Sequence, residues 1–202
     1  MATVTVEVVG LPRLGLNLSD LERRALPRAL ARTLNSVATT VRKEDIRKIA
    51  RFMGVKQSVV RERTDIKRAT PKQREPVAQI RYKGRRMNLI RFGARQRQKG
   101  VSARPWGKRR IFPQTFIVDL GTGVPFVAVR KQPGASQRHE YAGTYQPARR
   151  VGRIPVVGVV GPGVAETAAM PEFADARKKR ARELIVQRLP RELAFYTARM
   201  RG

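Results

Sequence analysis

The stretch "TFIVDLGTGVPFVAVR", residues 115–130, decides the fold class. Its two ends, 115–120 and 125–130, are rich in β-branched and aromatic residues, and the turn "GTG" lies between them. Strands joined by so short a connection run antiparallel, because a parallel pair needs a crossover of a dozen or more residues. We therefore expect a sheet built from hairpins and not from alternating strands and helices.

Periodic segments on either side of this hairpin complete the fold. Residues 3–9, "TVTVEVV", alternate as in a half-buried strand. The Ser19 and Glu22 pair predicts a helix start, and apolar residues at three- and four-residue spacing continue the helix through about Phe52, with Pro27 near its beginning. Further on, "RIPVVGVV" (153–160) predicts a strand, and residues 172–200 predict a helix with Pro190 as a kink.

The remaining segments are expected to be a hairpin and two loops. The strand-like pieces at 76–82 and 85–92 predict a β-hairpin that turns at Lys83 and Gly84. Residues 93–113 and 131–152 lack periodicity and contain several glycines and prolines, so we expect two extended loops. The whole order predicts a single α+β domain over 1–202, with a mainly antiparallel sheet packed against a long N-terminal helix and a C-terminal helix.

The charge of the chain points to an anionic partner. The 202 residues include 44 Lys and Arg against 15 Asp and Glu, for a formal charge of +29. Such a charge destabilises a compact state by self-repulsion unless a partner compensates it. Hydrophobic residues make up 41% of the chain, which is enough for a folded core. No apolar stretch approaches the ~20 residues of a membrane span, so we expect no membrane partner.

One basic segment, "FGARQRQKGVSARPWGKRR" (92–110), is the candidate binding site. It has no acidic residue and holds Trp106, which we expect to anchor the segment on protein. Its cations suit either the DNA backbone or an acidic protein surface, and a solvated arm is the third interpretation. The DNA- or partner-binding residues predicted from this segment are Arg95, Arg97, Lys99, Arg104, Lys108, Arg109 and Arg110.

A second segment, at about 46–63, has the spacing of a helix-turn-helix. Ala50, Gly54 and Val60 fall at the expected offsets, and Gly54 permits a sharp turn. Arg63 stands where a DNA-reading helix would carry an apolar residue. A helical corner packed on its own domain is the favoured interpretation, and a sequence-specific DNA-binding regulator is the alternative function.

The sequence offers little for catalysis. The chain has no cysteine and one histidine, His139, which excludes disulfides, thiolate sites and a zinc site rich in histidine. Most acids, Glu44 and Asp45 among them, lie on predicted helices beside basic residues, where pairing on the helix surface explains them. A nuclease built from dispersed acids such as Asp119 and Glu140 stays a third alternative. We expect a binding or structural protein, not an enzyme, with no cofactor and no metal.

The order of four segments resembles the prophage minor tail protein Z family, also called tail completion proteins. These segments are "LPRALARTLNSVATTVRKEDIRKIARFMGV", "RFGARQ" with "KGVS" at 91–102, "FPQTFIVDLGTGVPFVAVRK", and "IPVVGVVGPGV" before the last helix. The resemblance covers most of residues 19–190 and is weakest in the polar run 131–150.

The resemblance implies a structural virion protein of a long-tailed bacteriophage, assembled in the host cytoplasm. It implies a place at the head-proximal end of the tail, the neck, where the tail joins the head connector and the end of the genome passes. The implied partners are further copies in a ring of sixfold symmetry, the tail terminator, tail tube and head-tail connector proteins, and double-stranded genomic DNA bound without sequence preference.

Overall fold

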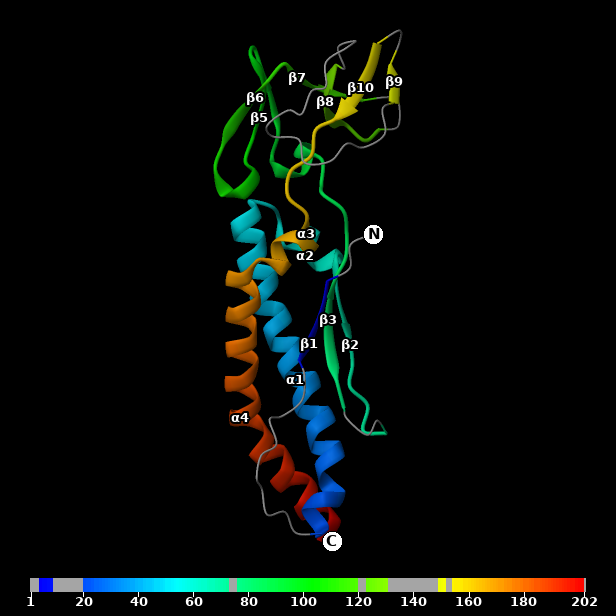
Figure 1. Cartoon of the computed structure of the whole chain (residues 1–202), viewed down its shortest axis with the longest axis vertical. Helices are drawn as coiled ribbons and strands as arrows, with labels where there is room; N and C mark the ends of the chain where they lie inside the picture. The colour runs from blue at the N-terminus through cyan, green and yellow to red at the C-terminus, as the bar shows by residue number, and fades with distance from the viewer. Residues whose placement is uncertain are drawn as a thin grey trace. The chain divides into compact units, whose positions relative to one another are not determined.

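A computed structural model of the chain describes residues 4–8, 20–72, 76–119, 123–130, 149–151 and 154–201 (Figure 1). The chain divides into two compact units, each assembled from separated segments. Unit 1 comprises residues 1–2, 48–60 and 84–167, and unit 2 comprises residues 3–47, 61–83 and 168–202. Because neither unit is one continuous stretch of chain, the division into units does not separate the sequence into two domains. The single domain expected over residues 1–202 stays a prediction.

Unit 2 contains a three-stranded antiparallel sheet. The strands are β1 (Val4–Val8), β2 (Thr64–Lys67) and β3 (Ala78–Tyr82), in the order β1-β3-β2. Ala78, Ile80 and Tyr82 alternate along β3 and are all buried, as the two-residue period of a strand requires. Strand β1 confirms the strand predicted at residues 3–9.

Two long helices cover this sheet and pack on each other. Helix α1 (Asp20–Met53) and helix α4 (Pro171–Arg201) confirm both predicted helices, and Pro27 and Pro190 lie inside them. The cap residue Ser19 lies outside the described residues. Within unit 2, each helix buries a stripe of apolar residues at helical spacing: Ala25, Ala29, Leu34, Val37, Ala38 and Val41 on α1, and Ala181, Leu184, Ile185 and Leu189 on α4.

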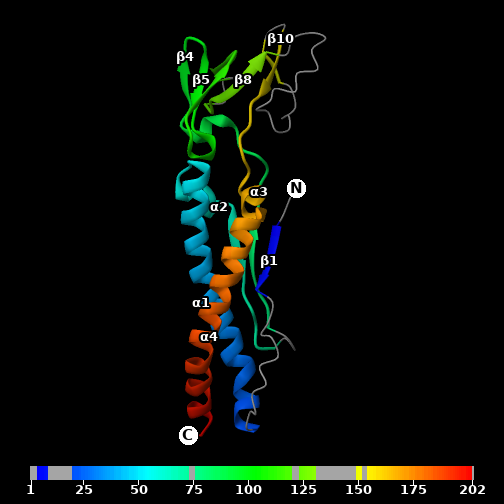
Figure 2. The ribbon, with the colours of Figure 1, turned by 60° about the vertical axis from the view of Figure 1, so that its left-hand side comes forward.

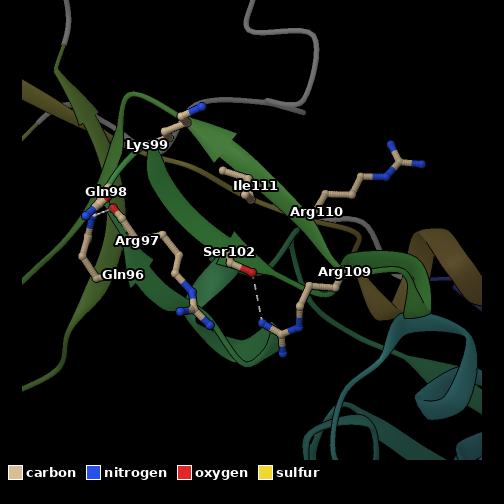
Figure 3. A pocket seen from close by; sticks show the side chains of 8 residues that line it. All are labelled: Gln96, Arg97, Gln98, Lys99, Ser102, Arg109, Arg110 and Ile111. Atoms are coloured by element: carbon tan, nitrogen blue, oxygen red, sulfur yellow. Dashed lines mark hydrogen bonds between the residues drawn. The ribbon is translucent and has the colours of Figure 1, made fainter.

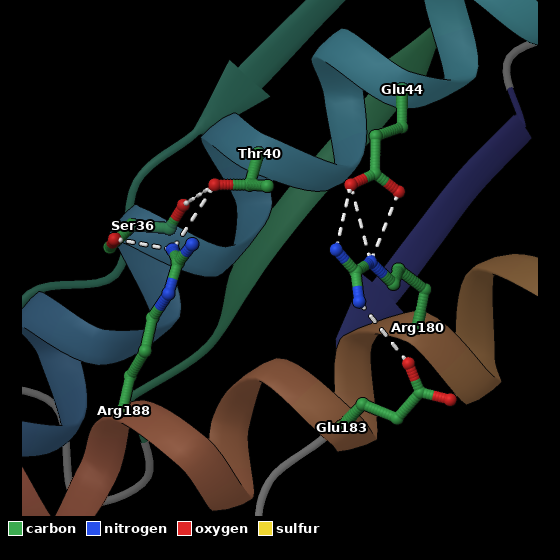
Figure 4. A network of polar contacts seen from close by, with 6 residues as sticks. All are labelled: Ser36, Thr40, Glu44, Arg180, Glu183 and Arg188. Carbon is green, nitrogen blue, oxygen red and sulfur yellow. Dashed lines mark hydrogen bonds and ion pairs between the residues drawn. The ribbon is translucent and has the colours of Figure 1, made fainter.

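Polar contacts line the seam between α1 and α4 (Figure 4). Arg180 donates to both carboxylate oxygens of Glu44 at 3.1 to 3.2 Å. Two turns further along α4, Arg188 donates to the hydroxyls of Ser36 and Thr40 at 2.7 and 3.1 Å. Because the α1 residues are spaced by four, they lie on one face of that helix and fix the register of α4 against it.

A buried polar trio joins α1, α4 and β3. Arg177 forms an ion pair with Asp45, and the Tyr82 hydroxyl donates to the same carboxylate. Arg177 also donates to the Ala168 carbonyl at 3.1 Å, and its guanidinium lies 4.9 Å from the centre of the Tyr82 ring. Burial and the Asp45 carboxylate raise the pKa of the Tyr82 hydroxyl, so it remains a donor.

The acids on α1 thus find partners on another helix, which corrects one prediction. Glu44 and Asp45 were expected to pair with basic neighbours on the surface of their own helix. Instead, both pair with arginines of α4, and Asp45 is only 4% exposed. Helical spacing shows which neighbours are available along one helix, but not which helix packs on it.

Unit 1 contains the hairpin expected at 115–130. Strands β7 (Thr115–Val118) and β8 (Phe126–Arg130) pair antiparallel, and β10 (Ile154–Gly158) and β9 (Arg149–Val151) extend the sheet in the order β7-β8-β10-β9. The antiparallel sheets and the two long helices confirm the predicted α+β class.

The hairpin predicted for 76–82 and 85–92 is wrong, because only its first strand exists. Both edges of β3 are already paired, one with β1 and the other with β2. Residues Leu89–Phe92 form a short 3-10 helix, η1, which Asn88 caps through its side chain. The same side chain donates to the Val127 carbonyl at 2.9 Å and accepts from the Val127 amide at 2.8 Å. This segment therefore lies against β8 of unit 1.

The extended loop predicted at 93–113 is also wrong, because it contains three strands. These are β4 (Arg95–Arg97), β5 (Gly100–Ala103) and β6 (Arg110–Pro113), with the 3-10 turn η2 (Pro105–Gly107) between the last two. Of the second predicted loop, 131–152, residues 131–148 and 152 lie outside the described residues, and 149–151 form β9. Two short helices complete the described elements: α2 (Gln57–Glu62) and α3 (Val164–Ala169).

Candidate functional site

The candidate site is the small sheet β4-β5-β6 of unit 1, which lies beside the β7-β8-β10-β9 sheet (Figure 2). All four residues of the central strand, β5, are buried. Val101 of this strand donates its amide to the Thr115 hydroxyl at 3.0 Å, and the Ile117 amide of β7 donates to the Gln96 side chain at 2.9 Å. The small sheet is therefore held against β7 by hydrogen bonds from both β4 and β5.

The structure brings all seven predicted site residues to this sheet, and every one of them is exposed. Arg95 and Arg97 lie on β4, and Lys99 lies in the turn between β4 and β5. Arg110 begins β6. The others, Arg104, Lys108 and Arg109, flank the turn η2. Residues predicted to lie in an irregular loop thus lie on the strands and turns of a small sheet.

A hollow of about 960 Å³ opens on the sheet (Figure 3). Four of the seven cations line it, together with two glutamines, one serine and one isoleucine: Arg97, Lys99, Arg109, Arg110, Gln96, Gln98, Ser102 and Ile111. The four uncharged residues were not among the predicted site residues. The only signal that could have found them is the pairing register of β4, β5 and β6, which was missed along with the strands.

The cations of this sheet differ in their pairing from several arginines and lysines elsewhere in the chain. Elsewhere, ion pairs hold Arg32 to Glu192, Arg86 to Glu166 and Lys83 to Asp65. Among the described residues, none of the seven predicted site residues has an ion pair with an acid. Concentrated positive charge without counter-charge favours the binding of an anion.

Only two of the seven side chains have a described hydrogen bond that fixes them. Arg104 donates to the Gly107 carbonyl at 2.7 Å. Arg109 donates to the Ser102 hydroxyl at 3.2 Å, and Ser102 is itself only 4% exposed. These bonds use part of each guanidinium and leave further N–H donors for a ligand.

Trp106 lies in η2, between the basic residues of this site. Its backbone has φ 55° and ψ 31°, a left-handed conformation that is strained for a residue with a side chain. It is 40% exposed, so the protein covers only part of its ring. The rest of the ring faces solvent at the edge of the basic sheet.

The corner between α1 and α2 has the turn that the sequence predicted. Gly54 has φ 72°, and a Cβ atom at this position would lie 2.5 Å from the Arg104 carbonyl oxygen. The turn therefore packs against the chain leading into η2, and this part of unit 1 covers it. Helix α2 has only six residues, which is about 9 Å of helix.

The described residues contain no group of three acids or histidines that could hold a metal ion. Of the two acids in the nuclease alternative, Asp119 is exposed after β7 and Glu140 lies outside the described residues.

Comparison with known families decides the class of protein. The family model of prophage minor tail protein Z matches residues 9–199, which is nearly the whole chain. The chain belongs to this family. Comparison with curated proteins and with solved structures found no match.

Membership of the prophage minor tail protein Z family makes this chain a structural protein of a bacteriophage tail, found in the virion. No helix in the described part of the chain has the length and apolar character needed to cross a membrane.

Proposed function

We propose that this chain is the tail completion protein at the head-proximal end of the tail. There it forms a closed ring that joins the tail to the head connector and contacts the end of the genome. The observation that carries the proposal is the β4-β5-β6 sheet, where seven exposed cations gather and none has an ion pair among the described residues. The family supports a place in the tail, and this sheet supports an anionic partner there.

Duplex DNA fits this sheet because its backbone is a dense array of negative charge. Lys and Arg that neutralise phosphates release condensed counterions, which makes binding strong at low salt and independent of base sequence. The sheet presents cations without the helix that reads bases in the major groove. Genomic DNA passing the neck would meet such a surface in any base sequence.

A ring follows from the charge and from the usual symmetry of assemblies. A formal charge of +29 opposes the packing of identical subunits unless anions lie close to them. Closed cyclic symmetry would point the same sheet of every subunit toward one central axis, where DNA supplies the counter-charge. The sixfold tail symmetry of the family predicts six copies, with the tail terminator, tail tube and connector proteins as neighbours.

The test is the position of the protein in purified virions. Antibody against the chain, or a tag fused to it, is expected to label the neck in electron micrographs. Phage lacking the protein are expected to accumulate filled heads and separate tails that do not join. Label at the distal tip of the tail, or normal joining without the protein, would overturn the proposal.

No observation favours the helix-turn-helix regulator over this function. Helix α2 is a single six-residue helix, and the chain leading into η2 covers the turn before it. A regulator would prefer one short DNA sequence over random DNA at fixed salt. We expect equal affinity for unrelated duplexes.

A further inference from the structure

The pairing register of the small sheet places two exposed arginines and the buried Ser102 on one face. Arg95 pairs with Ser102 and Ser102 with Ile111, while Arg97 pairs with Gly100. Paired residues in antiparallel strands point to the same face, as do residues two apart along a strand. Arg95, Arg97 and Ser102 thus share the face opposite to the buried Val101 and Phe112.

Arg109 reaches the same face from the start of β6. Its Nη1 atom donates to Ser102 Oγ at 3.2 Å, so its guanidinium lies over the middle of the sheet. Figure 3 shows the guanidinium groups of Arg97 and Arg109 turned toward each other beside Ser102. The two positive groups face one space, and no acid is among the residues that line it.

We propose that Arg97 and Arg109 form a clamp that holds one backbone phosphate of duplex DNA. Each planar guanidinium presents parallel N–H donors that match two oxygens of a phosphate, which a lysine ammonium cannot do. Ser102 orients Arg109 for this contact and leaves its other N–H groups to the ligand. The inference rests on the proposed contact between this sheet and the genome.

The surroundings of the clamp favour DNA over an acidic segment of a protein. Arg95 lies on the same face of β4 as Arg97, and Lys99 lines the same hollow. Both are exposed and have no ion pair with an acid among the described residues. An extended positive field matches a polymer in which every nucleotide carries a charge. The clamp would fix where the duplex lies on the sheet, and the surrounding cations would add sequence-independent attraction.

The test replaces the two planar guanidinium groups with lysine ammonium groups, which keep the same charge. We compare the double variant Arg97→Lys/Arg109→Lys with a matched control, Arg51→Lys/Arg91→Lys, which changes two exposed arginines of unit 1 outside the hollow. The probe is a fluorescently labelled duplex of random sequence, and anisotropy gives its affinity over a series of salt concentrations. Thermal unfolding of each variant checks that it folds like the parent protein.

The clamp predicts about tenfold weaker binding for the Arg97→Lys/Arg109→Lys variant, corresponding to about 1.4 kcal/mol, and a change below about twofold for the control. The slope of log affinity against log salt should stay the same in both, because no charge is lost. Changing Arg97 and Arg109 to Gln should lower that slope by about 0.9, since the clamp holds one phosphate and each lost phosphate contact contributes about 0.9.

The outcomes separate the clamp from the proposed function. If the Arg97→Lys/Arg109→Lys variant binds DNA as tightly as the parent, the clamp is wrong while the basic sheet remains a DNA surface. If the parent protein shows no salt-dependent DNA binding, the DNA contact itself is wrong and the clamp falls with it. If the variant binds DNA normally but its phage fail to join heads to tails, the two arginines hold carboxylates of a neighbouring protein.

Discussion

Removing the Arg177 guanidinium should destabilise unit 2 more than any exposed substitution on the same helix. In the variant Arg177→Met, the Asp45 carboxylate stays buried with the Tyr82 hydroxyl as its remaining described partner. The side chains of Arg177 and Asp45 are 1% and 6% exposed, so water cannot replace the lost charge without opening the packing. Breaking a buried ion pair in this way costs about 3 to 5 kcal/mol.

The loss of stability can be measured as a shift in the melting temperature. For a chain of this length, each kcal/mol lowers the midpoint by about 2 to 4 °C, so Arg177→Met should lower it by about 6 to 20 °C. Far-ultraviolet circular dichroism during heating follows α1 and α4 directly. Lys178→Met is the matched control, because this neighbouring α4 cation is 65% exposed and its pair with Asp175 is long, at 3.8 Å. It should change stability by no more than about 0.5 kcal/mol.

A third variant tests the reason for the effect. Arg177 Nη1 has no hydrogen-bond partner among the described residues, and a buried donor without a partner costs about 1 to 3 kcal/mol. The trio therefore contributes more to the choice of one arrangement of α1, α4 and β3 than to the free energy of unfolding. Replacing all three polar groups together, as Asp45→Leu/Tyr82→Phe/Arg177→Met, should recover most of the loss or exceed the parent stability. Equal melting temperatures for Arg177→Met and Lys178→Met would contradict the cost assigned to the buried ion pair.

Urea unfolding should show that Gly100→Ala lowers the free energy of unfolding by more than about 2 kcal/mol, because Gly100 has φ 141° and a Cβ atom there would lie 2.0 Å from the Phe112 carbonyl oxygen. Gly93→Ala should lower it by only about 1 to 2 kcal/mol, because Gly93 has φ 64° but open space around it. Glu44→Gln should lower the melting temperature by a small fraction of the Arg177→Met effect, since Arg180 is 42% exposed, and an equal loss would contradict the contrast between buried and exposed pairs. The fluorescence of Trp106, the only tryptophan, should change when duplex DNA is added and become less accessible to a soluble quencher, whereas an unchanged signal would place the DNA elsewhere. Changing six cations of the sheet to Gln should flatten the salt dependence of DNA binding with little loss of stability, and an unchanged slope would point to a protein partner; the six are Arg95, Arg97, Lys99, Lys108, Arg109 and Arg110.

Sequence patterns predicted the elements that have a clear period and missed those that do not. The stripe of α1 and the hairpin at 115–130 are long enough for periodicity to show. In β4 all three residues are exposed, and in β5 all four are buried, so neither strand alternates. Their positions depend on contacts with β7, which no local pattern reveals.

The sequence predicted which charged residues make up the candidate site, but not how the strands arrange them. The density of Arg and Lys in residues 92–110 identified all seven exposed cations of the sheet. The register that places Arg97 on the same face as Ser102 could not be predicted, because it requires knowing that strands exist there. The hairpin expected at 76–82 and 85–92 failed for a related reason, since nothing in its residues shows that β1 and β2 take both edges of β3.

The buried trio also has a consequence for the order of events during synthesis. Asp45 and Arg177 are 132 positions apart, so a ribosome adding about 5 to 20 residues per second makes the carboxylate about 7 to 26 s before its counter-charge. During that interval the apolar stripe of α1 has no α4 to cover it, and the nascent chain is open to chaperones and proteases. A chain that stops short of Pro171 stays in that condition permanently. Products truncated before the last helix leave this stripe uncovered, and we expect them to be degraded before they can enter a growing tail.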